Sequence, residues 1–186
     1  MLQHRLSPMV RAALLVADLE RSRAFYTDLL GIAEVFFEGE LSEGNTHVLL
    51  GVPASTRLRA VILKAPGPAY GMVGLFELST PTPAPVRRSS NAANVGDVTL
   101  VFYCDQLDPV YEALKQGGHT IISPPLNLII GDFVKQREMI FRDPDGVLIN
   151  LIEWDPDEAR RPELRRQEDE LQGDPGSGSI PPPARE

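Results

Sequence analysis

The sequence has little of what several classes of protein need. Its 186 residues contain one cysteine, Cys104, so no disulfide framework exists and a reducing cytoplasm is the expected location. No apolar run reaches the roughly 18 residues of a membrane-spanning helix. Lys and Arg number 18 against 26 Asp and Glu, which gives a net charge of −8, and the basic residues form no cluster. Binding to nucleic acid or to a membrane is therefore not expected.

Familiar catalytic motifs are missing too. The chain has no GxGxxG or GxxxxGK[ST] phosphate loop, no CxxC pair and no HExxH zinc motif. Cys104 lies in the apolar run TLVFYC, which favours a buried, inert thiol. Three histidines stand at positions 4, 47 and 119, each interpreted as a surface or hydrogen-bonded residue. Of these, His47 is kept as an outside candidate for a pocket.

The last part of the chain differs in composition from the rest. Residues 155–186 are rich in charge, Pro, Gly and Ser and nearly without large apolar side chains. Such a segment cannot bury enough surface to offset the entropy lost on ordering. We therefore predict a largely disordered tail after residue 154.

The preceding part contains an internal repeat. RAALLVADL, an apolar run ending in Asp18, leads into a helical pattern that stops at Gly31. TLVFYCDQL leads in the same way into a second helical pattern, 88 positions later. This shift places Leu19 on Leu107, so each copy is predicted to begin with a strand followed by a helix.

Each helix is followed by strand candidates, so the predicted plan is βαβββ, linker, βαβββ. We place the first module at residues 8–80, the linker at 81–96 and the second module at 97–154. The fold class is α+β, with two modules forming a cupped mixed sheet around a pocket. The strand candidates after the helices are 33–40, 46–52, 58–64 and 72–79, then 119–123, an indistinct 126–131, 137–142 and 147–153.

One polar residue interrupts the final apolar strand. In VLINLIE, alternation places Leu148, Asn150 and Ile152 on one face. A buried amide without a partner costs about 1–3 kcal/mol, so Asn150 is expected to meet another polar group. DPDG, just before this strand, has the residues of a tight reversal between two strands.

Two stretches resemble a known family, the vicinal oxygen chelate superfamily of glyoxalases, bleomycin-resistance proteins and extradiol dioxygenases. LLVADLERSRAFYTDLLGI resembles the opening strand and helix of that family, and FRDPDGVLINLIE resembles its closing hairpin. The resemblance covers about residues 8–154. It implies a pocket in which two positions on the first strands and two on the last strands bind a divalent metal.

Carried onto this chain, those four positions fall on Arg11 and Thr99 in the first strands, and on Glu77 and Asn150 in the last. Only Glu77 is a good metal ligand, and the fixed charge of Arg11 opposes a cation. We therefore predict no cofactor and no four-ligand metal site; a divalent metal held by Glu77, with His47 as an outside candidate, is the disfavoured alternative. The same residues suit either an Arg11–Glu77 ion pair inside a satisfied polar cluster or a working site.

In the working site, Arg11 would anchor a carboxylate or enolate oxygen and Glu77 would act as the general base. Thr99 and Asn150 would orient the substrate, and Tyr103 and Arg59 are further binding candidates. Two hypotheses follow from the resemblance. The favoured one, because Arg11 and Glu77 resemble a charged catalytic pair, is an isomerase, epimerase or lyase acting by proton transfer on a small oxygenated metabolite. The other is a non-catalytic, drug-sequestering protein, and in either case a homodimer is expected.

Overall fold

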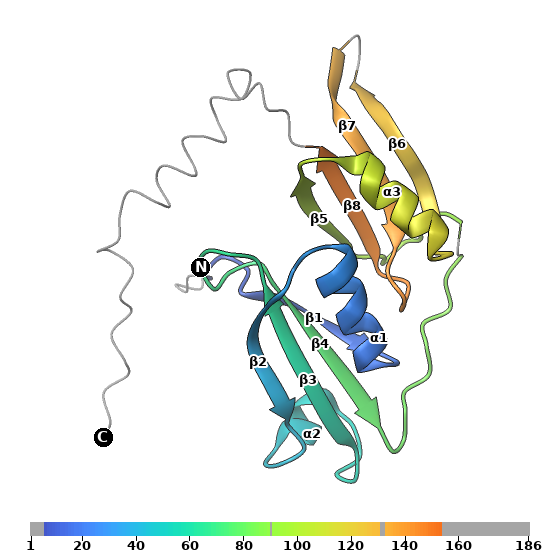
Figure 1. The fold of residues 1–186 in the computed structure, drawn as a ribbon. Coiled ribbons are helices and arrows are strands. Elements are labelled where there is room, and N and C mark those ends of the chain that lie inside the picture. Colours follow the sequence, from blue (N-terminus) through green and yellow to red (C-terminus); the bar gives the residue numbers. More distant parts are fainter. Residues whose placement is uncertain (1–5, 90, 131–132, 154–186) are drawn as a thin grey trace, which may run out of the picture. The chain divides into compact units, whose positions relative to one another are not determined.

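The computed structural model describes residues 6–89, 91–130 and 133–153. The tail predicted after residue 154 lies outside these residues. The described residues build two four-stranded sheets, each with a helix on one face (Figure 1). This architecture confirms the predicted α+β class and its two βαβββ modules.

The first module forms one mixed sheet with the strand order β1-β4-β3-β2, in which β1 and β4 run parallel. A π-helical turn, Phe25–Leu29, continues helix α1. The elements are β1 (Arg11–Val16), α1 (Leu19–Ala24), β2 (Glu34–Glu40), α2 (Thr46–Leu50), β3 (Arg57–Lys64) and β4 (Met72–Ser79).

The second module repeats this order, with strands β5-β8-β7-β6 and a parallel pair of β5 and β8. Both long helices begin after a residue in extended conformation, Asp18 or Gln106. The elements are β5 (Thr99–Cys104), α3 (Leu107–Gln116), β6 (Ile121–Ile130), β7 (Phe133–Arg142) and β8 (Leu148–Glu153).

Two strand predictions were wrong. Within the predicted strand 46–52, Thr46–Leu50 form the short helix α2, and Gly51 after it has a left-handed conformation (φ 65°) that glycine adopts without strain. The predicted strands 119–123 and 126–131 are not separate: residues 121–130 form one strand, β6, whose register shifts between Ser123 and Leu126, and residue 131 lies outside the described residues. The two prolines inside that shift are tolerated because β6 is an edge strand of its sheet.

One hydrophobic core joins the helix-bearing faces of the two sheets. Phe25 at the end of α1 contacts Phe141 of β7, with the ring centroids 6.2 Å apart. It also contacts the His119 ring edge-on at 5.2 Å. The buried core residues from both modules are Val16, Leu19, Phe25, Tyr26, Ile32, Val61, Leu63, Val73, Leu75, Leu100, Leu107, Leu114, Met139, Phe141, Ile149 and Leu151.

The DPDG turn also fastens the two modules to each other. Asp143 accepts hydrogen bonds from the backbone N–H groups of Asp145 and Val147 and from the Tyr26 hydroxyl at 2.8 Å. The Asp145 carboxylate accepts from the N–H of Ala17 at 2.9 Å, and from two side chains of α1, Arg21 and Ser22. The turn therefore binds, through polar contacts, the junction of β1 and α1 in the first module. We call these contacts of Asp143 and Asp145 the clasp.

A buried arginine holds part of the linker against the second module. Arg142 of β7 is 5% exposed and donates to Asp97 at 3.0 Å and to the carbonyl oxygens of Ser89 and Ala92. Arg88 forms a second ion pair with Asp97 at 2.9 Å. Hydrogen bonds from Asn94 and Arg142 lower the pKa of Asp97 to about 2. The linker is thus tied down at its second half.

Among the helices of the described residues, none has the length and apolar character that a bilayer crossing requires.

Candidate functional site

The structure does not bring Arg11 and Glu77 together. In the parallel pairing of β1 and β4, Arg11 lies beside Met72 and Glu77 lies beside Val16. Five residues of strand separate the two positions, about 16 Å at the usual rise per residue. Alternation along the strands also turns the two side chains to opposite faces of the sheet. The predicted Arg11–Glu77 ion pair is therefore wrong.

Glu77 instead supports the start of α1. Its carboxylate accepts a hydrogen bond from the Leu19 N–H at 2.8 Å, and Arg59 of β3 lies 3.8 Å away. Arg59 is itself held by Glu20 at 2.6 Å. Both residues thus lie toward the helix, and neither has the position in the pocket that the sequence analysis gave it.

The second module repeats this arrangement with Glu153. Its carboxylate accepts from the Leu107 N–H at 3.0 Å, at the start of α3, and Arg137 lies 3.3 Å away. Carboxylates suit this place because the first N–H groups of a helix lack partners within the helix. Glu77 and Glu153 are counterparts in the repeat, and both have a structural role.

Replacing Glu77 or Glu153 by alanine is expected to lower the free energy of unfolding by about 1–2 kcal/mol, the usual cost of losing a helix cap. Urea titration followed by circular dichroism measures this. Glu77→Gln keeps an oxygen acceptor and should lose less. A Glu77→Ala protein with unchanged stability but lost ligand binding would restore Glu77 as a pocket residue.

The counterpart of Asn150 is Gly74, and the predicted equivalence with Glu77 is wrong. Asn150 pairs with Val101 of β5, and Gly74 pairs with Ala13, which is Val101 shifted by 88 positions. A Cβ atom at residue 74 would lie 2.7 Å from the Phe76 ring. The first module has neither a side chain at this position nor room for one.

The four family positions, corrected in this way, are Arg11, Gly74, Thr99 and Asn150. They offer a cation, no side chain, a hydroxyl and an amide, a set that does not fit a zinc-like or iron-like ion. Within the described residues, no three His, Cys, Asp or Glu side chains group closely enough to hold a metal. Glu77, the one good ligand in the predicted set, caps a helix instead.

The polar residues of the second sheet do meet on one face, which we call the open face. It carries Thr99 and Tyr103 of β5, Asn150 of β8, and Glu138 of β7, a residue that the sequence analysis missed. These side chains share a face because strand neighbours in register point the same way. Thr99 is exposed, and Tyr103 is 47% exposed.

Asn150 has the polar partner that its sequence position requires. Its amide nitrogen donates to the Glu138 carboxylate at 3.0 Å and to the Met139 carbonyl oxygen at 3.2 Å. Gln136 donates to the other oxygen of Glu138. The sequence could have shown this. Pairing the two strands across the DPDG turn places Glu138, in REMIFR, on the same face as Asn150.

Apolar side chains surround this polar centre. Val101 is 54% exposed and Leu126 is 47% exposed, although both lie on strands. Ile140 and Ile152 are half-buried beside Asn150 and Glu138. An exposed apolar surface around a few fixed polar groups is typical of a binding face.

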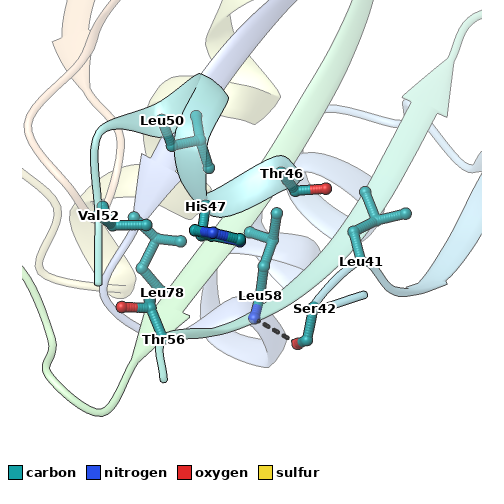
Figure 2. Close-up of a pocket in the computed structure, with 9 residues that line it drawn as sticks. All are labelled: Leu41, Ser42, Thr46, His47, Leu50, Val52, Thr56, Leu58 and Leu78. Carbon is teal, nitrogen blue, oxygen red and sulfur yellow. Dashed lines mark hydrogen bonds between the residues drawn. The ribbon is translucent and has the colours of Figure 1, made fainter. Parts of the chain in front are cut away.

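A small pocket lies under α2 in the first module (Figure 2). His47 lines it, as do Leu58 and Leu78 from the strands below. Thr56, another lining residue, is 5% exposed, and its hydroxyl finds no hydrogen-bond partner among the described residues. His47 therefore reaches a cavity, although not one on the second sheet.

The superfamily of this chain follows from its match to a family model. Residues 9–151 match the model of the Glyoxalase/Bleomycin resistance protein/Dioxygenase superfamily. The chain belongs to this superfamily. The resemblance noted from its two sequence stretches is confirmed. No curated protein matches the chain.

Solved structures of this superfamily share the fold at low identity. A glyoxalase family protein from Bacillus cereus is 17% identical, with a TM-score of 0.63 over 82% of this chain and 97% of that one. A mutant of glyoxalase I from Zea mays is 18% identical, with a TM-score of 0.55 over 79% of this chain and 44% of that one. TnmS3, an antibiotic binding protein from a Streptomyces species, is 18% identical, with a TM-score of 0.50 over 82% of this chain and all of that one. These similarities establish the fold and not the activity.

Proposed function

We propose that this superfamily member binds a small molecule on its open face, without a resident metal. The observation that carries the proposal is the Asn150–Glu138 pair, a fixed polar centre within exposed apolar surface. Small-molecule sites commonly combine apolar walls with a few oriented polar groups. Asn150 stands where the family resemblance implies a metal-binding carboxylate, and its amide is committed to Glu138.

Binding is better supported than the expected proton-transfer chemistry. A general base must reach the proton that it removes. Glu77, the predicted base, points toward a helix, and the carboxylate oxygens of Glu138 each accept an amide hydrogen. We therefore favour the drug-sequestering or metabolite-binding hypothesis over an isomerase, epimerase or lyase. The cytoplasm remains the proposed location.

A second copy of the chain is the proposed cover for the open face. The helix-bearing faces of both sheets are buried in the common core. On the opposite faces, Leu15 of β1 is 55% exposed and Val101 of β5 is 54% exposed. Apolar surface on two sheets of one chain suits a homodimer in which each copy helps to enclose the ligand.

A neutral fluorescent probe tests this function. N-phenyl-1-naphthylamine should brighten on binding to the wild-type protein, and Val101→Asp should weaken that binding about tenfold or more by placing a charge in the apolar surface. Val48→Asp, on the exposed side of α2, is the matched control and should bind as the wild type does. Equal binding by the Val101→Asp protein would refute the proposal.

The same variants report on the dimer in sedimentation velocity. Leu15→Asp and Val101→Asp should both shift the protein toward monomer, since each places a carboxylate in the proposed interface. A wild-type protein that sediments as a monomer at all concentrations would remove the homodimer and leave the binding face intact.

A further inference from the structure

The orientation of the Asn150 amide determines which of its atoms a ligand meets. Its two donor contacts go to acceptors that cannot donate, a carboxylate oxygen of Glu138 and the carbonyl oxygen of Met139. Turning the amide over would place its oxygen against both acceptors, so this orientation is fixed by the network. Asn150 is 8% exposed, and its Oδ1 atom is then the one left to accept a further hydrogen bond.

Glu138 adds acceptor capacity beside that oxygen. Each carboxylate oxygen has about two acceptor sites, and Asn150 and Gln136 each occupy one. The side chain is half-buried, so a ligand bound to it is shielded from water on one side. The polar centre of the open face therefore combines a neutral acceptor with a negatively charged one.

The nearby cation is already engaged elsewhere. Arg142 follows Glu138 by four residues on the same strand, but its guanidinium is bound to Asp97 and to carbonyl oxygens of the linker and the DPDG turn. Arg137 points to the helix side, where it pairs with Asp108 and Glu153. Arg11, predicted to anchor an anion, lies on the other sheet.

We propose that the open face selects ligands with an apolar body and a hydrogen-bond-donating end, protonated amines above all, and disfavours carboxylates and phosphates. This inference rests on the proposed binding function and names its ligand class. Asn150 Oδ1 and the Glu138 carboxylate accept from the donor end. Val101, Leu126 and Ile152 contact the apolar body. A carboxylate at the same place would face two acceptors and a like charge.

Three probes with one common ring system test the selection. They are 1-naphthylmethylamine, 1-naphthalenemethanol and 1-naphthylacetate, each competed against N-phenyl-1-naphthylamine at low and high salt. The expected order of affinity is amine, then alcohol, then acid, with about tenfold or more between amine and acid. Salt should weaken the amine and leave the alcohol nearly unchanged.

Variants separate charge from shape. Glu138→Gln keeps the size of the side chain and should reduce the preference for amine over alcohol to about threefold or less, while binding of the neutral probe persists. Glu112→Gln, on the outer surface of α3, removes a charge elsewhere and should leave the whole order unchanged.

The outcomes distinguish the two proposals. If the neutral probe and all three naphthyl compounds fail to bind, the proposed function falls and this inference falls with it. If all bind but the acid equals or exceeds the amine, the ligand class is wrong while the binding function stands. An amine preference that survives in the Glu138→Gln protein would also overturn the inference, because the charge would then come from elsewhere.

Discussion

Replacing Asp143 by alanine is expected to lower the free energy of unfolding by about 3 kcal/mol. Asp143 is 5% exposed and takes three hydrogen bonds, from Tyr26, Asp145 and Val147. Truncation leaves the buried Tyr26 hydroxyl without its acceptor and loosens the turn at the same time. Scanning calorimetry should show a melting temperature lower by roughly 6–12 °C, given about 2–4 °C per kcal/mol for a domain of this size.

Two matched variants separate the clasp from general damage to the turn. Asp143→Asn retains an oxygen for the two backbone donors, and the Tyr26 hydroxyl can reorient, so its loss should be under half that of the alanine variant. Tyr26→Phe removes only the contact between modules and should cost about 1–2 kcal/mol. An Asp143→Ala protein as stable as Asp143→Asn would show that the clasp contributes little.

The pH dependence of the clasp has a definite sign. Burial raises the pKa of the Asp143 carboxyl, an effect that hydrogen bonds from Tyr26 and two backbone groups only partly offset. A folded-state pKa above the unfolded value of about 3.9 means that this residue favours folding most when protonated. Its contribution should decline as pH rises through the folded-state pKa, and Asp143→Asn should remove that decline. Unfolding midpoints from pH 4 upward in both proteins measure it.

The hairpin role of DPDG could be predicted from sequence, but its role between modules could not. Proline and glycine specify the reversal locally. The partners Tyr26 and Ala17 lie 117 and 128 residues from their acceptors. Only the folded arrangement of two modules brings these residues together, so no local pattern contains that information.

At the candidate site, the prediction from sequence matched the wrong positions in the last strands of the two modules. The repeat correctly placed β1 on β5 because helix starts 88 positions apart share a strand–helix corner. The last strands of the modules lie 76 positions apart, as the helix-capping pair Glu77 and Glu153 shows. Asn150 was compared with the nearest acid instead of with Gly74, a shift of three residues. An odd shift along a strand moves a side chain to the opposite face.

Helix α2 was missed for a different reason. THVLLGV has the β-branched and apolar composition of a strand and is too short to show a helical period. In the structure the apolar residues of α2 have different surroundings. Leu50 lines the cavity, whereas Val48 and Leu49 are 68% and 84% exposed. Composition alone could not distinguish a strand from one helical turn lying over the end of a sheet.

Replacing Arg142 by methionine is expected to destabilise the protein by about 1–3 kcal/mol, because buried oxygen atoms lose their donor while Arg88 still pairs with Asp97. Asp97, with a side chain 5% exposed, would keep its charge and lose a donor at 3.0 Å. The carbonyl oxygens of Ala92 and Gly146 would lose donors as well. Urea denaturation measures the loss, and amide hydrogen exchange should rise first in residues 91–98.

Removing both charges tests whether the ion pair itself is responsible. The double variant Arg142→Met/Asp97→Leu removes the buried carboxylate together with its buried partner, and Arg88, with a side chain 25% exposed, can still reach water. It should therefore recover part of the stability that Arg142→Met loses. Acid gives an independent check. The pKa of Asp97 is lowered to about 2 by hydrogen bonds from Asn94 and Arg142, so its contribution is present above pH 4 and is lost as the pH falls toward 2. In the Asp97→Asn protein, the free energy of unfolding should fall less as the pH drops below 4. An Arg142→Met protein whose stability falls as steeply below pH 4 as the wild type would show that Asn94 and Arg88, and not Arg142, hold the carboxylate.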